Sequence, residues 1–224
     1  MPAISPGNSR RCYGGQAPDS LLDSYEIERK PHITELVATT KAIGELDGER
    51  ARRRDEWLGD AFDRGAAETS RQKFIPDLAV GLLGRDETGK LAPAAGTLFV
   101  QPTVKDAQDV SHRLDDLIGE CFAVITCGPE PQRWLTGSAE MQWREIGGRR
   151  IVVSPTAPFR DGLTAAYVEE GAVLQDWMHR LGQGAIVVRP DKYVFGFAQD
   201  ETSLQRMVEQ VVNAMNELDQ LQPG

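Results

Sequence analysis

The strongest constraint on the fold is a set of short apolar segments in the second half of the chain. Residues 121–127, Cys-Phe-Ala-Val-Ile-Thr-Cys, contain no charged side chain. An apolar run of this kind is typical of a strand covered on both faces. Three more runs are expected to be strands, at residues 150–153, 185–188 and 193–197. Strands that are buried on both faces need helical layers, so the pattern predicts an α/β fold.

Helical patterns separate these expected strands. Residues 138–146 form a short predicted helix, and apolar residues at helical spacing predict another over 171–181, ended by Gly182. A last helix begins after a cap supplied by Asp200 or Thr202. The resulting order is β-α-β-α-β-β-α, which is the order of a thioredoxin-like domain.

This order predicts a thioredoxin-like domain over residues 114–224, with a four-stranded sheet between helices. The last two strands are joined by residues 189–192, where Pro190 holds the second position expected for a type I turn. The core is expected to contain Ile125, Val152, Val187 and Val194.

The first half of the chain lacks such regular alternation. Residues 1–19, rich in Pro, Gly and Ser, are expected to form a flexible lead-in. Residues 20–66 are expected to form a helical arm, which begins with a long helix over 20–46 that Pro31 kinks near residues 28–30. Residues 67–113, rich in Gly and Pro with short apolar runs, are expected to be an extended linker rather than a packed unit.

Charge and hydropathy make two partners poor candidates. Lys and Arg total 25 against 34 Asp and Glu, so the net charge is −9, which disfavours nucleic acid and anionic membranes. The longest uncharged run, residues 91–104, is shorter than the roughly 18 to 20 residues of a membrane-spanning helix and contains two prolines, so no membrane helix is expected. The N-terminus has no apolar secretory segment, so a cytoplasmic protein is expected.

Two motifs resemble reactive sites only in part. Residues 84–90 match the G-x4-G-K spacing of a phosphate-binding loop, but Leu91 replaces the Mg²⁺-binding hydroxyl, and an exposed turn is the better interpretation.

Cys127 ends the first predicted strand, where a redox C-x-x-C would open the next helix, but Glu130 replaces the second thiol. Redox-active members of the thioredoxin-like fold place a cis-proline just before the third strand, where this chain has Gly182 to Gly184. A buried structural cysteine is therefore favoured over monothiol chemistry.

No other catalytic or metal-binding pattern emerges. Cys121 and Cys127 lie about 20 Å apart along one strand, so they are not expected to form a disulfide. His32, His112 and His179 each stand alone in their segments, which makes a zinc site improbable. The sequence contains neither G-x-S-x-G nor G-x-G-x-x-G, and no catalytic, cofactor-binding or metal-ligating residue is assigned.

Four blocks of the sequence resemble one family in the same order. Residues 15–32 include Leu-Leu-Asp-Ser-Tyr-Glu-Ile-Glu-Arg-Lys-Pro-His, and the others are 96–102, 117–125 and 187–194. These blocks resemble FAD-dependent aromatic-ring monooxygenases related to 3-(3-hydroxyphenyl)propionate hydroxylase and phenol hydroxylase. In that family the first block is the helix after the second flavin-contacting motif.

The resemblance implies an oxidoreductase that uses FAD, NAD(P)H and O₂ to hydroxylate a phenolic ring. The flavin-binding glycine motif of the family has no counterpart in this chain. A C-terminal portion, from a truncated gene product or a mis-called start, is therefore expected, and it is expected to be inactive by itself. The implied partners are the N-terminal flavin and substrate domain or a neighbouring subunit, in a homo-oligomer. The alternative is a free-standing, non-redox thioredoxin-like interaction module.

Overall fold

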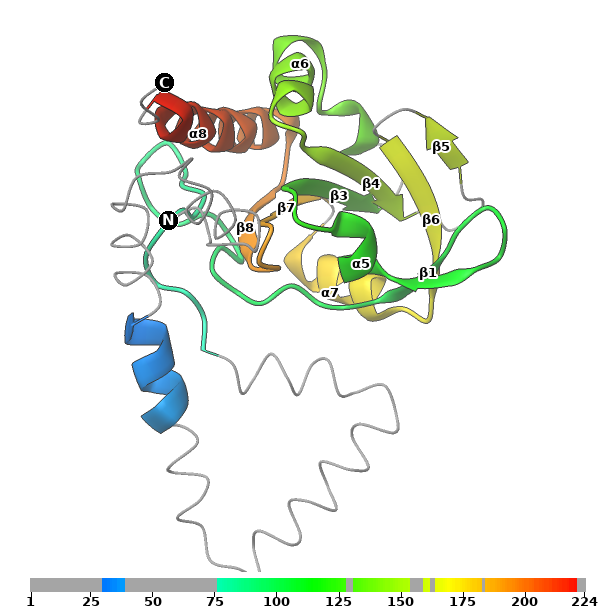
Figure 1. Cartoon of the computed structure of the whole chain (residues 1–224), viewed down its shortest axis with the longest axis horizontal. Helices are drawn as coiled ribbons and strands as arrows, with labels where there is room; N and C mark the ends of the chain where they lie inside the picture. Colours follow the sequence, from blue (N-terminus) through cyan, green and yellow to red (C-terminus); the bar gives the residue numbers. More distant parts are fainter. Residues whose placement is uncertain are drawn as a thin grey trace, which may run out of the picture.

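The computed structural model describes residues 30–38, 76–127, 131–153, 159–161, 164–182 and 184–220. In this part of the chain, eight strands form one mixed sheet in the order β2-β1-β6-β4-β3-β7-β8, with β5 paired to β6 (Figure 1). The strands are β1 (Thr103–Lys105), β2 (Ser111–Arg113), β3 (Ala123–Cys127), β4 (Arg149–Val153), β5 (Phe159–Asp161), β6 (Thr164–Glu170), β7 (Ala185–Val188) and β8 (Val194–Ala198).

Helices cover both faces of the sheet, as Figure 1 shows. They are α5 (Leu114–Ile118), the 3₁₀ turn η1 (Pro131–Arg133), α6 (Gly137–Glu145), α7 (Val173–Leu181) and α8 (Glu201–Gln220). Side chains of β3 alternate between two cores: Ala123 and Ile125 pack on the side of α5 and α7, and Val124 packs on the side of α6 and α8. This alternation explains why the strand is apolar throughout.

The central prediction of the sequence is confirmed for the order of elements. The strand β4 is parallel to β3, whereas β7 is antiparallel to β3 and β8 is antiparallel to β7. With α6, α7 and α8 these strands follow the predicted order β-α-β-α-β-β-α. The four expected core residues are buried, with at most 3% of each exposed (Ile125, Val152, Val187, Val194).

The prediction of a four-stranded sheet is wrong, because β1, β2, β5 and β6 extend it. Three of these strands have only three residues, too short for a recognisable alternation. The longer β6 has the sequence Thr-Ala-Ala-Tyr-Val-Glu-Glu, whose short apolar run was not expected to form a strand. It is a strand because it pairs with β4, β5 and β1, and such pairing depends on distant segments.

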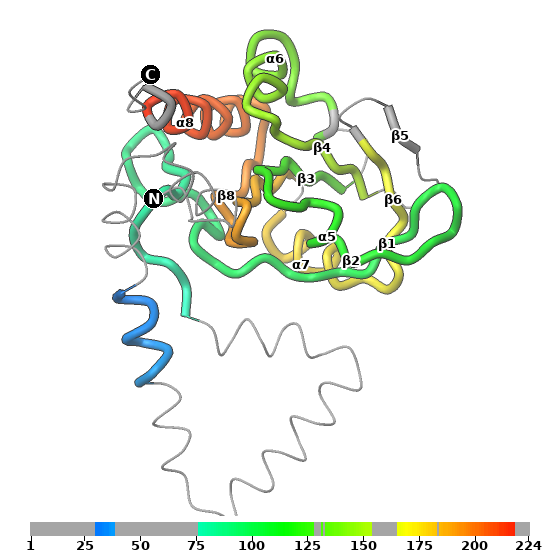
Figure 2. The backbone as a smooth tube through the Cα atoms, in the orientation of Figure 1, coloured from blue at the N-terminus to red at the C-terminus, as the bar shows by residue number. Residues whose placement is uncertain are grey.

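Residues 76–113 are packed on the domain, which corrects the expectation of an unpacked linker there. Buried side chains in this segment include Leu78, Phe99 and Val104. Backbone hydrogen bonds join it to the outer edge of β8, among them Gly84 N–H to the carbonyl of Phe195 at 2.8 Å. Figure 2 traces the segment along β8. The segment thus covers an edge that would otherwise offer unpaired backbone groups to other chains.

The expected arm from 20 to 66 is described only at residues 30–38, which are helical. The lead-in at 1–19 lies outside the described residues, and of the expected kink near residues 28–30 only Lys30 is described. Pro31 occupies the second described position of the helix. In the described part of the chain, no helix has the length and apolar character required to cross a membrane.

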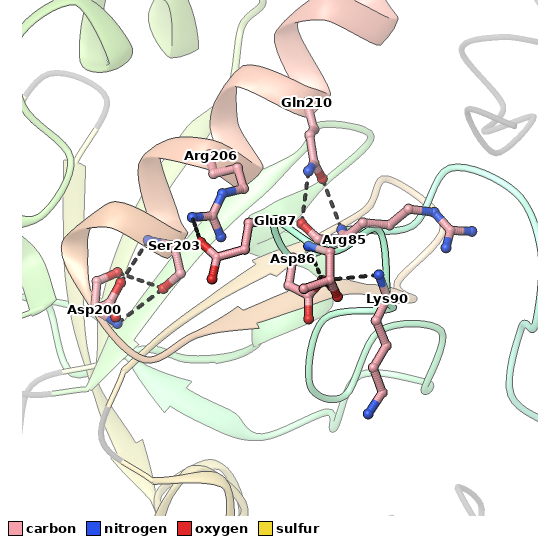
Figure 3. A network of polar contacts seen from close by, with 9 residues as sticks. Arg85, Asp86, Glu87, Lys90, Asp200, Ser203, Arg206 and Gln210 are labelled. Carbon is pink, nitrogen blue, oxygen red and sulfur yellow. Dashed lines mark hydrogen bonds and ion pairs between the residues drawn. The ribbon is translucent and has the colours of Figure 1, made fainter.

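The structure decides which of the two expected residues caps α8. Asp200 Oδ1 accepts a hydrogen bond from the backbone N–H of Ser203 at 2.7 Å, and Ser203 Oγ accepts one from Asp200 N–H at 3.2 Å (Figure 3). Hydrogen bonds to the Asp200 carboxylate lower its pKa, first that from the backbone N–H of Ser203 and then that from the Ser203 side chain. Asp200 is therefore the cap, and Thr202 lies within the helix.

We expect Asp200→Ala to lower the free energy of unfolding by about 1 kcal/mol, because the backbone N–H of Ser203 in the first turn of α8 loses its partner. Thr202→Ala is the matched control and should change it by less than about 0.5 kcal/mol. Since folding lowers the pKa of Asp200, its stabilisation is present above the ordinary aspartate pKa of 3.8 and is lost as the pH falls through the lower pKa of the folded state. Urea unfolding at pH 7 and at acidic pH tests both effects; equal losses in the two variants would refute the assignment.

Candidate functional site

Cys127 lies at the end of β3, the place in the fold where redox relatives of this topology carry their thiols. Burial, and secondly the Glu169 carboxylate, raises the pKa of the Cys127 thiol to about 12. A thiol with such a pKa is almost entirely protonated near neutral pH and is a poor nucleophile. This agrees with the prediction of a structural cysteine, while Glu130 lies outside the described residues. Cys121 and Cys127 are free, as their spacing predicts.

Glu169 has a structural task that the sequence pattern did not reveal. It is buried on β6, and its Oε1 accepts a hydrogen bond from Leu174 N–H at 2.7 Å. Its Oε2 accepts a second from Gln175 N–H at 3.2 Å. The N-cap residue of α7, Ala172, makes no side-chain cap bond, so a carboxylate from the preceding strand replaces it. This carboxylate also keeps negative charge near Cys127.

Gly184 precedes β7, at the place where redox members of this topology hold a cis-proline. A Cβ on Gly184 would lie 2.1 Å from the carbonyl oxygen of Ala198 and 2.6 Å from the Phe197 ring. Proline also carries a Cβ, so it does not fit here without movement of β8. The described residues contain no cis peptide bond. The position therefore serves close backbone packing.

The loop with G-x4-G-K spacing is a turn docked on α8, as Figure 3 shows. Its Asp86 Oδ1 accepts hydrogen bonds from the backbone N–H groups of Thr88 and Lys90, at 2.8 and 3.0 Å. Gln210 on α8 bonds the backbone of Arg85 in both directions, at 2.9 and 3.0 Å. A carboxylate thus uses the backbone donors that a phosphate would need, which agrees with the predicted turn.

The histidines do not form a metal site among the described residues, where no group of three or more potential ligands occurs. His179 is exposed on α7. His112 Nε2 lies 2.8 Å from Asp106 Oδ2 in the β1–β2 hairpin. His32 is buried, with only 8% of its surface exposed, and its Nε2 lies 2.9 Å from the hydroxyl of Tyr193. His32 and Tyr193 are 161 residues apart in the sequence, so no local sequence pattern predicted this contact.

A buried ion pair lies in the turn between β7 and β8. Arg189 is fully buried, and its guanidinium donates to both carboxylate oxygens of Asp191, at 3.1 and 3.0 Å. It also donates to the carbonyl of Leu82 at 3.0 Å, which ties residues 76–98 to the sheet. The N–H of Lys192 bonds the carbonyl of Arg189 at 3.0 Å, as expected of a β-turn.

Comparison with known families decides where this chain belongs. Residues 96–214 match the sequence model of the HcaD C-terminal domain. The chain belongs to this family. The match covers more than half of the chain and includes β1 to β8 and most of α8.

Several relatives of this chain are named as aromatic hydroxylases. A "3-(3-hydroxy-phenyl)propionate/3-hydroxycinnamic acid hydroxylase" of Klebsiella pneumoniae is 30% identical over 205 residues, which are 84% of this chain and 36% of that protein. A similarly named Burkholderia vietnamiensis protein is 26% identical over 243 residues, 84% of this chain and 39% of that protein. A "probable NADH-specific resorcinol 4-hydroxylase" of Rhodococcus jostii is 28% identical over 202 residues, which are 88% of this chain and 35% of that protein. The chain thus spans less than two-fifths of these relatives.

The crystal structure of the flavin-dependent monooxygenase PieE, in complex with FAD and substrate, shares the fold. It matches with a TM-score of 0.50 and 19% identity, over 92% of this chain and 42% of that one. The resemblance to FAD-dependent aromatic hydroxylases found in the sequence is therefore confirmed at the level of the family.

Three helix N-termini in the described part of the chain, those of α6, α7 and α8, do not fit the pyrophosphate of FAD. A dinucleotide pyrophosphate is held by free backbone donors at a helix N-terminus. The N-terminus of α7 is occupied by the Glu169 carboxylate, that of α8 by Asp200, and the first turn of α6 carries Glu140. Each of these carboxylates would repel a pyrophosphate.

Proposed function

We propose that this chain serves as the non-redox, thioredoxin-like C-terminal domain of a FAD-dependent aromatic hydroxylase. The observation that carries the proposal is the match of residues 96–214 to the HcaD C-terminal domain family. The relatives' names suggest a phenolic acid such as 3-(3-hydroxyphenyl)propionate as the substrate of the whole enzyme. Ring hydroxylation with FAD, NAD(P)H and O₂ belongs, in this proposal, to a flavin-binding part outside this chain.

Within such an enzyme the role of this chain is structural. The protonated Cys127 and the carboxylate-capped helices support a domain that supplies neither a thiol nor a flavin ligand. Its partners are a flavin and substrate domain or a neighbouring subunit in a homo-oligomer. The exposed apolar side chains Ile33 and Val37, 48% and 60% exposed, lie one helical turn apart and support such a contact.

Flavin binding tests the proposal directly. We expect the purified chain, incubated with FAD and desalted, to retain no flavin absorption band, because its helix N-termini are already occupied by carboxylates. NADH and NADPH should not be consumed faster when 3-(3-hydroxyphenyl)propionate or resorcinol is added. The flavin-dependent monooxygenase PieE, treated identically with FAD, is the positive control for a retained flavin band. A retained flavin band or phenol-stimulated NAD(P)H consumption would mean that this chain is itself an enzyme.

A free-standing interaction module is the second candidate. It is supported by the edge of β8 being covered within the chain, which gives the domain a closed surface of its own. Size-exclusion chromatography of extract from the native host separates the two candidates. If the chain is the C-terminal domain of a hydroxylase, it should co-elute with a flavoprotein that shows phenol hydroxylase activity. If it is a free-standing interaction module, it should elute without flavin.

A further inference from the structure

We propose that the outer edge of β8 is a surface for pairing with a second copy of this chain, and that residues 78–97 of the same chain occlude it. Residues 78–97 are the edge strap. The strand β8 ends the order of the sheet, and its inner edge pairs with β7. The inference concerns this sheet edge and does not depend on the proposed hydroxylase function.

The edge strap bonds the backbone groups that β8 would use to pair with another strand. The N–H of Val194 donates to the carbonyl of Thr97 at 2.8 Å, and the carbonyl of Val194 accepts the N–H of Gly96 at 2.9 Å. Further along the strand, the N–H of Phe197 donates to the carbonyl of Pro93 at 2.9 Å. The strap therefore occupies the place that an added strand would take.

The sequence of β8 favours a second copy as the partner when this edge is uncovered. Residues 194–198 are Val-Phe-Gly-Phe-Ala and carry no charge. Two such strands meet without the like-charge repulsion that protects many sheet edges, and valine and phenylalanine favour strands. An antiparallel pair of identical strands is also symmetric, so each copy offers the other the same donors and acceptors.

Two glycines let the strap lie close to itself and to β8. A Cβ on Gly96, whose φ is +87°, would lie 2.1 Å from the carbonyl oxygen of Leu78. A Cβ on Gly84 would lie 2.9 Å from the carbonyl oxygen of Phe195. Because both obstacles are backbone atoms, alanine at either position should displace the strap.

Gly89 supplies the matched control within the strap. Its φ of +81° is close to that of Gly96, whereas a Cβ there would meet no atom of the described residues within 4 Å, its chain neighbours aside. Gly89→Ala therefore reproduces the backbone strain of Gly96→Ala without the collision.

Hydrogen–deuterium exchange of the purified full chain tests the proposal. In Gly84→Ala and Gly96→Ala, exchange in the strap should accelerate by about tenfold or more. Protection of the Val194 and Phe197 amides should then rise by about threefold or more when the protein concentration is raised about a hundredfold, because a second copy replaces the strap. Light scattering over the same range should show a doubling of the mass relative to the wild type.

The wild type and Gly89→Ala should protect both β8 amides to the same extent at every concentration. The proposal is overturned if the wild type depends on concentration like the two variants, or if the variants leave exchange in the strap unchanged. It is also overturned if the variants leave both amides unprotected at every concentration, or form only irregular aggregates. Loss of protection in β3 together with the strap would overturn it as well, because the strap would then be inseparable from the core.

Discussion

Asp191→Ala is expected to lower the free energy of unfolding by about 3–5 kcal/mol, the loss typical of a buried ion pair deprived of one partner. Arg189 has no exposed surface, and Asp191 accepts two of its hydrogen bonds. Without Asp191 the guanidinium would stay charged and buried, because arginine does not deprotonate in proteins. Denaturant unfolding of the full chain, followed by circular dichroism, measures this loss.

Two comparisons identify the cause. Glu87→Ala removes a surface partner of Arg206, at 3.2 Å, and should cost at most about 1 kcal/mol. The double variant Arg189→Met with Asp191→Ala removes both charges and should be more stable than Asp191→Ala alone. A double variant that is less stable than the single one would show that the bond from Arg189 to the Leu82 carbonyl, and not the buried charge, dominates.

Cys127 is expected to react with iodoacetamide at pH 8 about 10³-fold more slowly than an ordinary cysteine. A pKa of about 12 leaves only a minute thiolate fraction at that pH, whereas an unperturbed thiol has a pKa of about 8.5. A variant with Cys12 and Cys121 replaced by serine isolates the reaction, and mass spectrometry of the alkylated protein follows it.

The same measurement in denaturant provides the reference rate, because unfolding removes both causes of the raised pKa. Glu169→Gln should increase the folded-state rate only in part, since burial is the larger cause. A folded-state rate near the denatured rate would contradict the structural role of Cys127 and would reopen monothiol chemistry.

Local sequence patterns predicted the structure correctly where the residues of one segment are enough to show that it is buried. The apolar runs of β3, β7 and β8 predicted strands covered on both faces, and both cores are present. The partial motifs at Cys127 and at residues 84–90 were interpreted as non-functional because of single residues, Glu130 and Leu91. The structure supports both interpretations through different contacts. Burial and the charge of Glu169 raise the pKa of Cys127, and Asp86 accepts the backbone N–H of Thr88 in the loop.

The sequence by itself determined the order of the core elements and the buried character of the central strands, because strand and helix periodicities are local properties. Only the tertiary structure decided the extra strands, the packing of residues 76–113 along β8, and the contacts of His32 and Arg189. The physical reason is that these features consist of backbone pairing and polar contacts between distant segments. Tyr193 and His32, like Arg189 and Leu82, become neighbours only when the sheet has formed.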